Sequence, residues 1–152
     1  PYIYLYENLN DEDKKIFTRD KCCEFCGSLN ADGLKVELNK ADILLFVESF
    51  DIEMSEKTKY SLSTKVPEYM SVGKPIFAVG PSEIGSIDYL RDVSFCAFSE
   101  DKIYDKMIDM LSSKLEMRKK ATMAKEKFKK NHNVEQQEDL FMEICGISAL
   151  EK

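Results

Sequence analysis

Apolar residues along this chain fall into two alternating patterns. Short uninterrupted or alternating apolar runs, typical of strands, occupy residues 2–6, 22–26, 43–47, 76–79 and 94–98. Between them, apolar residues recur every three or four positions, as on one face of a helix. These segments predict helices over residues 12–20, 31–40, 64–72, 99–111 and 114–130 and a last helix that ends near Gly146. A further short helix is expected to begin at Ser86 or Asp88 and to run to Asp92.

The pattern also predicts which side chains point inward and which strand is central. Residues 43–47 form the most apolar stretch, so we expect the central strand there. Residues 50–62 are rich in acids and lysines and are predicted to be a long polar loop. The side chains expected to face inward from the helices are Ile16, Phe17, Leu115, Ala121, Ala124 and Phe128. Leu34 and Leu38 lie on one face of their helix, and the last helix holds Leu140, Phe141 and Ile144.

One stretch near the middle of the chain carries several local signals in the order of a complete helix and strand. Ser63 or Thr64 can cap the helix N-terminus with a hydroxyl, and Pro67 is tolerated only in the first turn. Gly73 suits a left-handed helix end, and the buried strand follows at once. The free amides at such a helix start, together with Lys65, predict an anion site.

Strands that alternate with helices predict an α/β fold, a Rossmann-like doubly wound parallel sheet with extra C-terminal helices. Ligands of such sheets bind at the carboxyl ends of the strands. The loops expected there cover residues 27–29, 48–63 and 80–86, and we expect them to converge on one crevice. The residues by themselves therefore predict a site for an anionic, nucleotide-like ligand.

Length, charge and composition exclude several classes of protein. The 152 residues suffice for one domain, and the net charge of −6 argues against a nucleic-acid binder held by phosphate contacts. No apolar run reaches the length of a membrane span, and the first residues lack a signal-peptide pattern. The abrupt start at Pro1 is typical of a cut inside a larger protein.

Three of the five cysteines lie close together, at Cys22, Cys23 and Cys26. A Cys-x-x-Cys pair can be half a zinc site or a redox pair, but no second pair exists. Thiols three apart on a strand also point to opposite faces. We therefore interpret these cysteines as small apolar residues with free thiols in a reducing compartment, and predict no metal site.

Several of these residues resemble a known family. The run Ser63-Thr64-Lys65-Val66-Pro67-Glu68-Tyr69-Met70, followed by Gly73-Lys74-Pro75-Ile76, looks like the C-terminal domain of GT-B glycosyltransferases. The branch it resembles is the large retaining group 1 that includes bacterial cell-surface polysaccharide enzymes. The strand at 41–46 and the segment at 22–29 fit the same pattern, so that the resemblance covers residues 2–145.

The resemblance implies a role for each matching residue. Glu68 would bind the ribose hydroxyls of a nucleoside diphosphate-sugar, with a UDP-sugar expected and no cofactor. Amides at the helix start would meet the diphosphate or the sugar, and a backbone loop would line the base. The residues that the resemblance assigns to the donor site are Glu68, Ser63, Thr64, Lys65, Gly27, Ser28 and Leu29.

The chain departs from the family pattern in two respects. The first glutamate of the family's E-x7-E motif falls on Tyr60, and the spacing does not choose among Glu48, Glu53 and Glu56 as its substitute. The domain's first strand and helix would precede Pro1, and the acceptor-binding domain is absent. We therefore expect residues 1–152 to be a single donor-binding domain, inactive by itself, whose acceptor glycan or glycolipid binds to the missing half.

Other functions and interpretations stay open at this stage. A nucleotide-sugar epimerase uses the same fold, and a non-catalytic nucleotide-binding or interaction module would explain Tyr60. Ser63 and Pro67 can simply start a helix, Lys65 can be solvated, and Glu68 can favour the helix dipole. The lysines of residues 114–130 can form a solvated face or touch anionic lipid at the inner face of the membrane in the cytoplasm.

Overall fold

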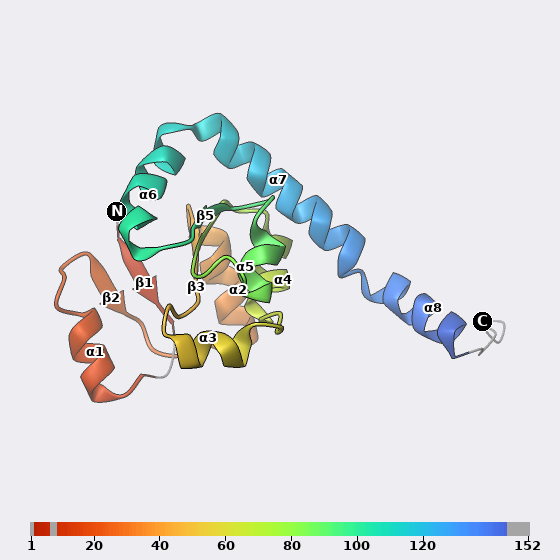
Figure 1. The fold of residues 1–152 in the computed structure, drawn as a ribbon, viewed down its shortest axis with the longest axis horizontal. Helices are drawn as coiled ribbons and strands as arrows, with labels where there is room; N and C mark the ends of the chain where they lie inside the picture. The colour runs from red at the N-terminus through yellow and green to blue at the C-terminus, as the bar shows by residue number, and fades with distance from the viewer. Residues whose placement is uncertain (1, 7–8, 146–152) are drawn as a thin grey trace. The chain divides into compact units, whose positions relative to one another are not determined.

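The computed structural model describes residues 2–6 and 9–145 (Figure 1), and the chain divides into two compact units, Pro1–Lys40 and Ala41–Lys152. Each unit has a parallel β-sheet with helical connections, so the predicted α/β class is confirmed. Whether the two units form the single expected domain stays a prediction. Gly146, where the last helix was expected to end, lies outside the described residues.

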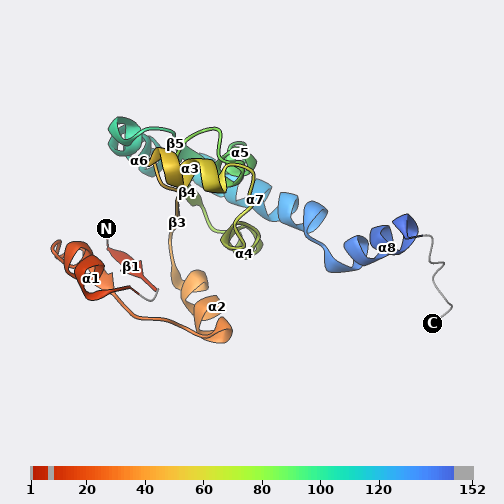
Figure 2. The same ribbon diagram turned by 60° about the horizontal axis from the view of Figure 1, so that its bottom comes forward.

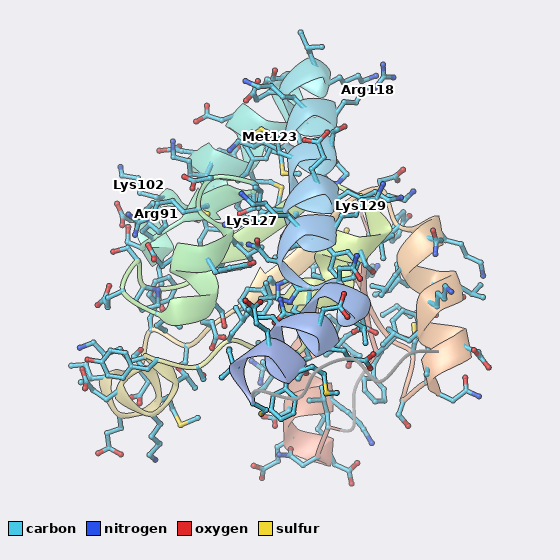
Figure 3. All side chains as sticks on the ribbon, turned by 90° about the vertical axis from the view of Figure 1, so that its right-hand side faces the viewer. Arg91, Lys102, Arg118, Met123, Lys127 and Lys129 are labelled. Carbon is cyan, nitrogen blue, oxygen red and sulfur yellow. The ribbon has the colours of Figure 1, made fainter. Side chains whose placement is uncertain are left out.

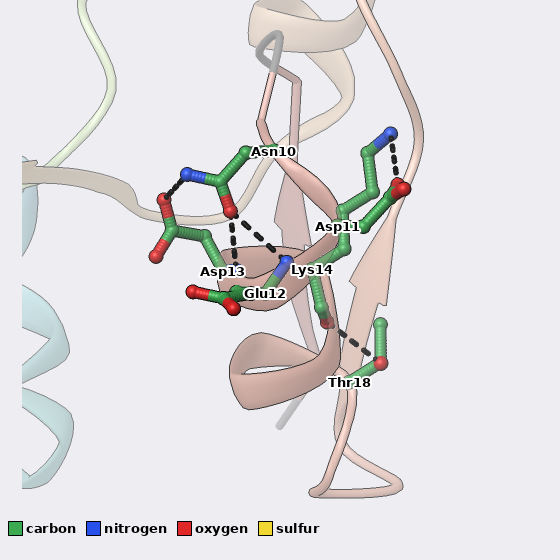
Figure 4. Close-up of polar contacts among 6 residues, drawn as sticks. All are labelled: Asn10, Asp11, Glu12, Asp13, Lys14 and Thr18. Atoms are coloured by element: carbon green, nitrogen blue, oxygen red, sulfur yellow. Dashed lines mark hydrogen bonds and ion pairs between the residues drawn. The ribbon is translucent and has the colours of Figure 1, made fainter.

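The first unit contains β1 (Ile3–Leu5), α1 (Asp11–Phe17), β2 (Cys23–Phe25) and α2 (Ala31–Lys40). The two strands are parallel, with Ile3 opposite Cys23. The Asn10 side chain caps α1 by accepting from the amides of Glu12 and Asp13, as Figure 4 shows. The expectation that Ile16 faces inward is wrong, because its side chain is exposed.

The second unit begins with β3 (Leu44–Val47), α3 (Ile52–Thr58), α4 (Lys65–Val72) and β4 (Ile76–Val79). It continues with α5 (Gly85–Leu90), β5 (Phe95–Ala97) and the 3-10 turn η1 (Glu100–Lys102). Three helices complete it: α6 (Ile103–Ser112), α7 (Lys114–Asn131) and α8 (Val134–Ile144). Figure 2 shows α7 leading away from the strands into α8.

The three strands of this unit are parallel and lie in the order β3-β4-β5. All four residues of β4 are buried, whereas β3 buries only alternate residues. The prediction that β3 is the central strand is therefore wrong for this sheet, in which β4 is central. The periodicity of a strand cannot reveal this, because an edge strand with one apolar exposed face also reads as a continuous apolar run.

One face of the sheet is covered by α6 and the start of α7. Phe77, Val79 and Ala97 form a buried cluster with Met110 of α6, and Met117 of α7 packs against it. Ala121 and Ala124 of α7 are buried as predicted, but Leu115 is 80% exposed, so its predicted inward position is wrong. The apolar residues of α8, Leu140, Phe141 and Ile144, are exposed in the described structure.

The segment predicted to be a polar loop contains α3. Asp51 caps this helix through the Met54 amide, and the Ser55 hydroxyl donates to the carbonyl of Ser49. None of its residues is buried. Because the helix shows no inward apolar stripe, hydrophobic periodicity gives no sign of it, and the local capping bonds define it instead.

Candidate functional site

The start of α4 is formed by local hydrogen bonds that leave its end open. Thr64 occupies the N-cap position without a side-chain cap bond. The Ser63 hydroxyl accepts from the Lys65 amide at 3.4 Å, and the Ser63 carbonyl accepts from the Val66 amide at 3.0 Å. Thr64 and Lys65 are both exposed. The predicted hydroxyl cap is therefore present only as a long contact from Ser63, and the positive end of the helix faces solvent.

Glu68 lies in the first turn of α4, one residue after Pro67. Its side chain is half-buried. Within the described residues, no hydrogen bond or ion pair engages its carboxylate; only its backbone carbonyl is used, accepting from the Ser71 hydroxyl at 2.7 Å. Pro67 contributes no amide, so the first turn presents fewer donors than an ordinary helix start. A carboxylate without protein partners can accept hydrogen bonds from a ligand's hydroxyl groups.

The inner side of α4 fixes the helix against the rest of the unit. Val66 and Met70 are fully buried, and α4 packs along α7. Gly73 ends the helix at φ +73°, and its amide donates to the Met70 carbonyl, which confirms the predicted left-handed end. A Cβ at this position would also lie 3.0 Å from the Lys125 side chain of α7. Burial on one side therefore holds the exposed helix start in place.

The loop before α4 is attached to the first turn of α5. The Gly85 amide donates to the Lys59 carbonyl at 2.7 Å. The fully buried Ser86 hydroxyl donates to the Ser61 carbonyl at 3.3 Å and accepts from the Ser63 amide at 3.0 Å. Two adjacent residues of α5 thus set the course of the backbone that enters α4. Sequence reasoning placed Ser86 at a helix start but did not find this positioning role, because no local pattern marks a bond between residues 23 apart.

Glu48 and Gly80 lie side by side at the carboxyl edge of the sheet. The Glu48 amide donates to the Val79 carbonyl, and the Gly80 amide donates to the Ala97 carbonyl. A Cβ at Gly80 would lie 2.8 Å from Glu48 Cβ, and the residue has φ +153°, so this close approach requires glycine. The Glu48 side chain therefore begins beside Gly80, the residue that directly follows the central strand β4.

The other acidic residues considered as substitutes for the missing motif glutamate lie elsewhere. Glu53 is exposed in the first turn of α3, and Glu56 pairs with Lys59 at 3.4 Å. Tyr60, which stands in the motif position, is 92% exposed. Among these acids, Glu48 is the one that directly follows a strand, at the edge where ligands of parallel sheets bind.

The predicted base-binding residues belong to the first unit. Gly27 has φ +74° with no atom close to where a Cβ would be, and Ser28 and Leu29 are exposed. The backbone there is open to a ligand, as the prediction requires. Whether Gly27, Ser28 and Leu29 share a site with Ser63, Thr64, Lys65 and Glu68 stays a prediction.

A polar cluster lies near this loop in the first unit. The Tyr6 hydroxyl donates to Glu37 at 3.1 Å, and Glu37 also pairs with Lys40 at 2.7 Å. Desolvation and the bond to Glu37 raise the pKa of Tyr6 well above its usual value, and the hydrogen bond from Lys40 lowers the pKa of Glu37. The cluster joins the end of β1 to α2, so we interpret it as structural.

Two kinds of feature are absent from the described residues: a metal-binding cluster and a membrane-spanning helix. Within residues 2–6 and 9–145, no group of three or more His, Cys, Asp or Glu side chains is arranged to hold a metal ion. None of the helices in that part of the chain is long and apolar enough to cross a bilayer.

Comparison with known proteins gives a likeness in structure alone. No protein-family model matches the sequence, and no curated protein matches it. Among solved structures, the fold is similar to that of WaaG, a glycosyltransferase involved in lipopolysaccharide biosynthesis, with a TM-score of 0.60 and 14% sequence identity. The match covers 82% of this chain and 33% of WaaG, so the chain spans about a third of that protein. This likeness shows that the chain shares its α/β fold with about a third of WaaG.

Proposed function

We propose that this chain is the donor-binding part of a glycosyltransferase, which transfers a sugar from a nucleoside diphosphate to an acceptor hydroxyl. The observation that supports it best is the open start of α4 at Lys65, beside the Glu68 carboxylate, which no other described residue engages. The likeness in fold to a part of WaaG is consistent with this proposal. A UDP-sugar is the proposed donor, as the family resemblance implies.

The α4 helix start would act on the diphosphate. The amides of Thr64 and Lys65 and the Lys65 ammonium would stabilise the negative charge that grows on the diphosphate as its bond to the sugar breaks. The Ser63 amide, which the sequence predicted to take part, is not available for this, because it donates to the Ser86 hydroxyl at 3.0 Å. The Glu68 carboxylate would accept hydrogen bonds from the two ribose hydroxyls. In this proposal Gly27, Ser28 and Leu29 line the base through their backbone.

Glu48 is our candidate for the work of the missing motif glutamate on the donor sugar. It follows β3 directly, and its backbone is fixed against β4 through the Val79 carbonyl. Tyr60 is a poor replacement for a carboxylate as a hydrogen-bond acceptor for sugar hydroxyls, because a phenol offers one oxygen where a carboxylate offers two. The family resemblance implies transfer with retention of configuration, in bacterial cell-surface polysaccharide or glycolipid synthesis.

The acceptor and the cellular location follow from the same proposal. The acceptor glycan or glycolipid would bind to a part of the protein outside these 152 residues. Free cysteine thiols are typical of a reducing compartment, so we propose a cytoplasmic reaction, at the inner face of the membrane where a lipid-linked acceptor would lie.

The experiment that tests the donor site is ligand-dependent thermal unfolding of the chain. UDP and GDP at millimolar concentration should raise the melting temperature, since a ligand at 100 times its Kd adds about 2.7 kcal/mol to the free energy of unfolding. Glu68→Gln should reduce the UDP-induced shift while leaving the melting temperature without nucleotide unchanged. Glu83→Gln, at an exposed position in the loop before α5, is the matched control.

The outcomes separate the parts of the proposal. An equal UDP-induced shift in Glu68→Gln and the parent chain would remove Glu68 from the site. No shift with either nucleotide, in this chain or in the longer protein that contains it, would contradict nucleotide binding altogether. A shift only in a longer protein that contains this chain would mean that the site requires residues outside these 152.

A non-catalytic nucleotide-binding module is a second candidate, favoured by the exposed Tyr60 in the position of the motif glutamate. Such a module would bind UDP but release no sugar. Product analysis of the longer protein with a radiolabelled UDP-sugar separates the two, because transfer moves the label to an acceptor, whereas binding alone leaves the donor intact.

A further inference from the structure

The charge of this protein is unevenly distributed, and α7 is its strongly basic element. The helix carries eight lysine or arginine residues against Glu116 and Glu126, a net charge of +6, whereas the whole chain has a net charge of −6. A helix that opposes the charge of its own protein so strongly concentrates positive potential along one rod of 18 residues. At 1.5 Å per residue, this rod is about 27 Å long.

Two of the cations serve the fold. Lys120 donates to the Asp92 carbonyl at 3.1 Å, and Lys127 donates to the Tyr89 carbonyl at 2.6 Å while lying over the Tyr89 ring. Both bonds hold α7 against the C-terminal end of α5. These contacts explain why Lys120 and Lys127 point inward, and they mark the side of α7 that faces the rest of the unit.

The other six cations are exposed and form what we name the α7 cationic face: Lys114, Arg118, Lys119, Lys125, Lys129 and Lys130. Figure 3 shows Arg118 and Lys129 on the same side of α7 and Lys127 on the opposite side. Of the two glutamates on this helix, Glu116 pairs with Lys119 at 3.5 Å, and Glu126 is exposed. The cationic face therefore keeps a net positive charge after its own acids are counted.

Exposed apolar side chains lie at one end of this face. Leu115, in the first turn of α7, is 80% exposed, and Leu111 in the last turn of α6 is exposed on the other side of the corner at Ser113. Tyr104 and Ile108 extend the exposed apolar stripe along α6. These leucines are not buried within the unit. They would gain favourable free energy if they entered the apolar interior of another structure.

We propose that the α7 cationic face is a docking surface for an anionic lipid membrane, on which α7 lies with Leu115 and Leu111 inserted at the interface. Cations would face the lipid headgroups, and the leucines would reach the boundary with the acyl chains. An anionic bilayer offers both the charge and the apolar layer. Nucleic acid fits less well, because single strands are bound through exposed aromatic rings, and the one aromatic residue of α7, Phe128, is half-buried and stacks on His132.

This inference does not depend on the proposed sugar transfer. It rests on α6 and α7, and the donor site rests on α4 and the strand ends. Vesicle binding and nucleotide binding are therefore separate measurements, and either can fail without the other.

Vesicle flotation tests the charge part of the proposal. The chain should bind vesicles of phosphatidylcholine with phosphatidylglycerol, bind pure phosphatidylcholine weakly, and be released by added salt. Because each basic residue near such a surface contributes about fivefold in affinity, removing four should weaken binding by about 600-fold. The variant combines Arg118→Gln, Lys119→Gln, Lys129→Gln and Lys130→Gln.

The matched control removes the same net charge from other elements, at exposed lysines for which the described structure shows no ion pair: Lys15→Gln, Lys21→Gln, Lys35→Gln and Lys57→Gln. It should bind nearly as well as the parent chain. Equal losses in the two variants would overturn the α7 assignment, because only net charge would then matter. Failure of the parent chain to bind anionic vesicles at low salt would overturn the proposal entirely.

A tryptophan reporter tests the insertion of Leu115. The chain has no tryptophan, so Leu115→Trp gives a single fluorescent probe. Its emission should shift to shorter wavelength with anionic vesicles and stay unchanged with a single-stranded oligonucleotide. Ile52→Trp on α3, at an equal 80% exposure, is the control and should not shift with vesicles. A shift at position 52 and none at 115, or tighter binding to the oligonucleotide than to vesicles, would overturn the proposal.

Discussion

Two neighbouring helix starts in the same unit, those of α4 and α5, differ in their exposure to solvent. Both follow polar loops, and each has a serine within two residues of its N-terminus. At α4 the N-cap Thr64 is exposed and the end faces solvent. At α5 the N-cap Ile84 is fully buried, and Ser86 and the Gly85 amide are bonded to the loop before α4. The buried start of α5 thus holds the loop that leads into the exposed start of α4.

The comparison shows why a helix N-terminus is not a binding site merely because it has free amides. The α5 amide at Gly85 is satisfied by the Lys59 carbonyl 2.7 Å away, so no anion can reach it. At α4, Thr64 and Lys65 remain exposed, while the buried side chains of Val66 and Met70 anchor the opposite side of the helix. The difference leads to four predictions, each for a substitution at one of these two helix starts.

The largest effect is expected from an acid at the buried start. Ile84→Asp should lower the free energy of unfolding by about 3–5 kcal/mol, because it buries a charge and empties an apolar site. Urea denaturation measures this loss. Ile84→Val, which keeps the site apolar, should lose only about 0.5–1.5 kcal/mol. A loss below 1 kcal/mol for the aspartate would mean that the α5 start opens to water.

The next largest loss of stability is expected from a side chain at Gly85, where the backbone of the preceding loop lies close. Gly85→Val should lower the free energy of unfolding by about 2–3 kcal/mol by overpacking, since its Cβ would lie 2.9 Å from the Ser61 carbonyl oxygen. Urea denaturation is again the measurement, with Glu83→Ala in the same loop expected to change stability by less than about 0.5 kcal/mol. A neutral Gly85→Val would show that the loop before α4 moves aside freely.

Removal of the bridging hydroxyl should have a smaller effect. Ser86→Ala leaves the Ser63 amide without its acceptor and should lower stability by about 1–2 kcal/mol. If the hydroxyl positions the α4 start, the UDP-induced rise in melting temperature should fall as well. Ser82→Ala, whose hydroxyl bonds only to the exposed Glu83 carboxylate within the described residues, is the control. An unchanged UDP-induced shift in Ser86→Ala would limit Ser86 to a role in stability.

The smallest change in stability, with the opposite sign, is expected at the open start. Thr64→Asp should raise the free energy of unfolding by about 0.3–1 kcal/mol through the helix dipole. The same carboxylate should repel a diphosphate and reduce the UDP-induced rise in melting temperature. Thr64→Asn can cap without charge and should leave UDP binding nearly intact. A larger UDP-induced shift in Thr64→Asp than in the parent chain would contradict diphosphate binding at this helix end.

Sequence signals that act within a few residues were sufficient for much of the fold. The bounds of α2 were predicted to the residue, and the left-handed end at Gly73 follows from the glycine itself. Parallel strands follow from their alternation with helices. In contrast, α3 was missed because its helix is held by caps rather than by an apolar stripe, and Leu115 was placed inward because spacing alone does not tell an insertion surface from a core.

For the candidate site, the sequence by itself determined the helix start at Ser63–Lys65, the position of Glu68 one turn in and the glycine-bearing loops, because each depends on backbone preferences of adjacent residues. Only the tertiary structure decided that the α5 start is closed by Lys59 and Ser61, that Glu48 lies against Gly80, and that β4 is the central strand. These features join residues distant in the chain, and a contact between distant residues is fixed by packing, not by the preferences of either partner.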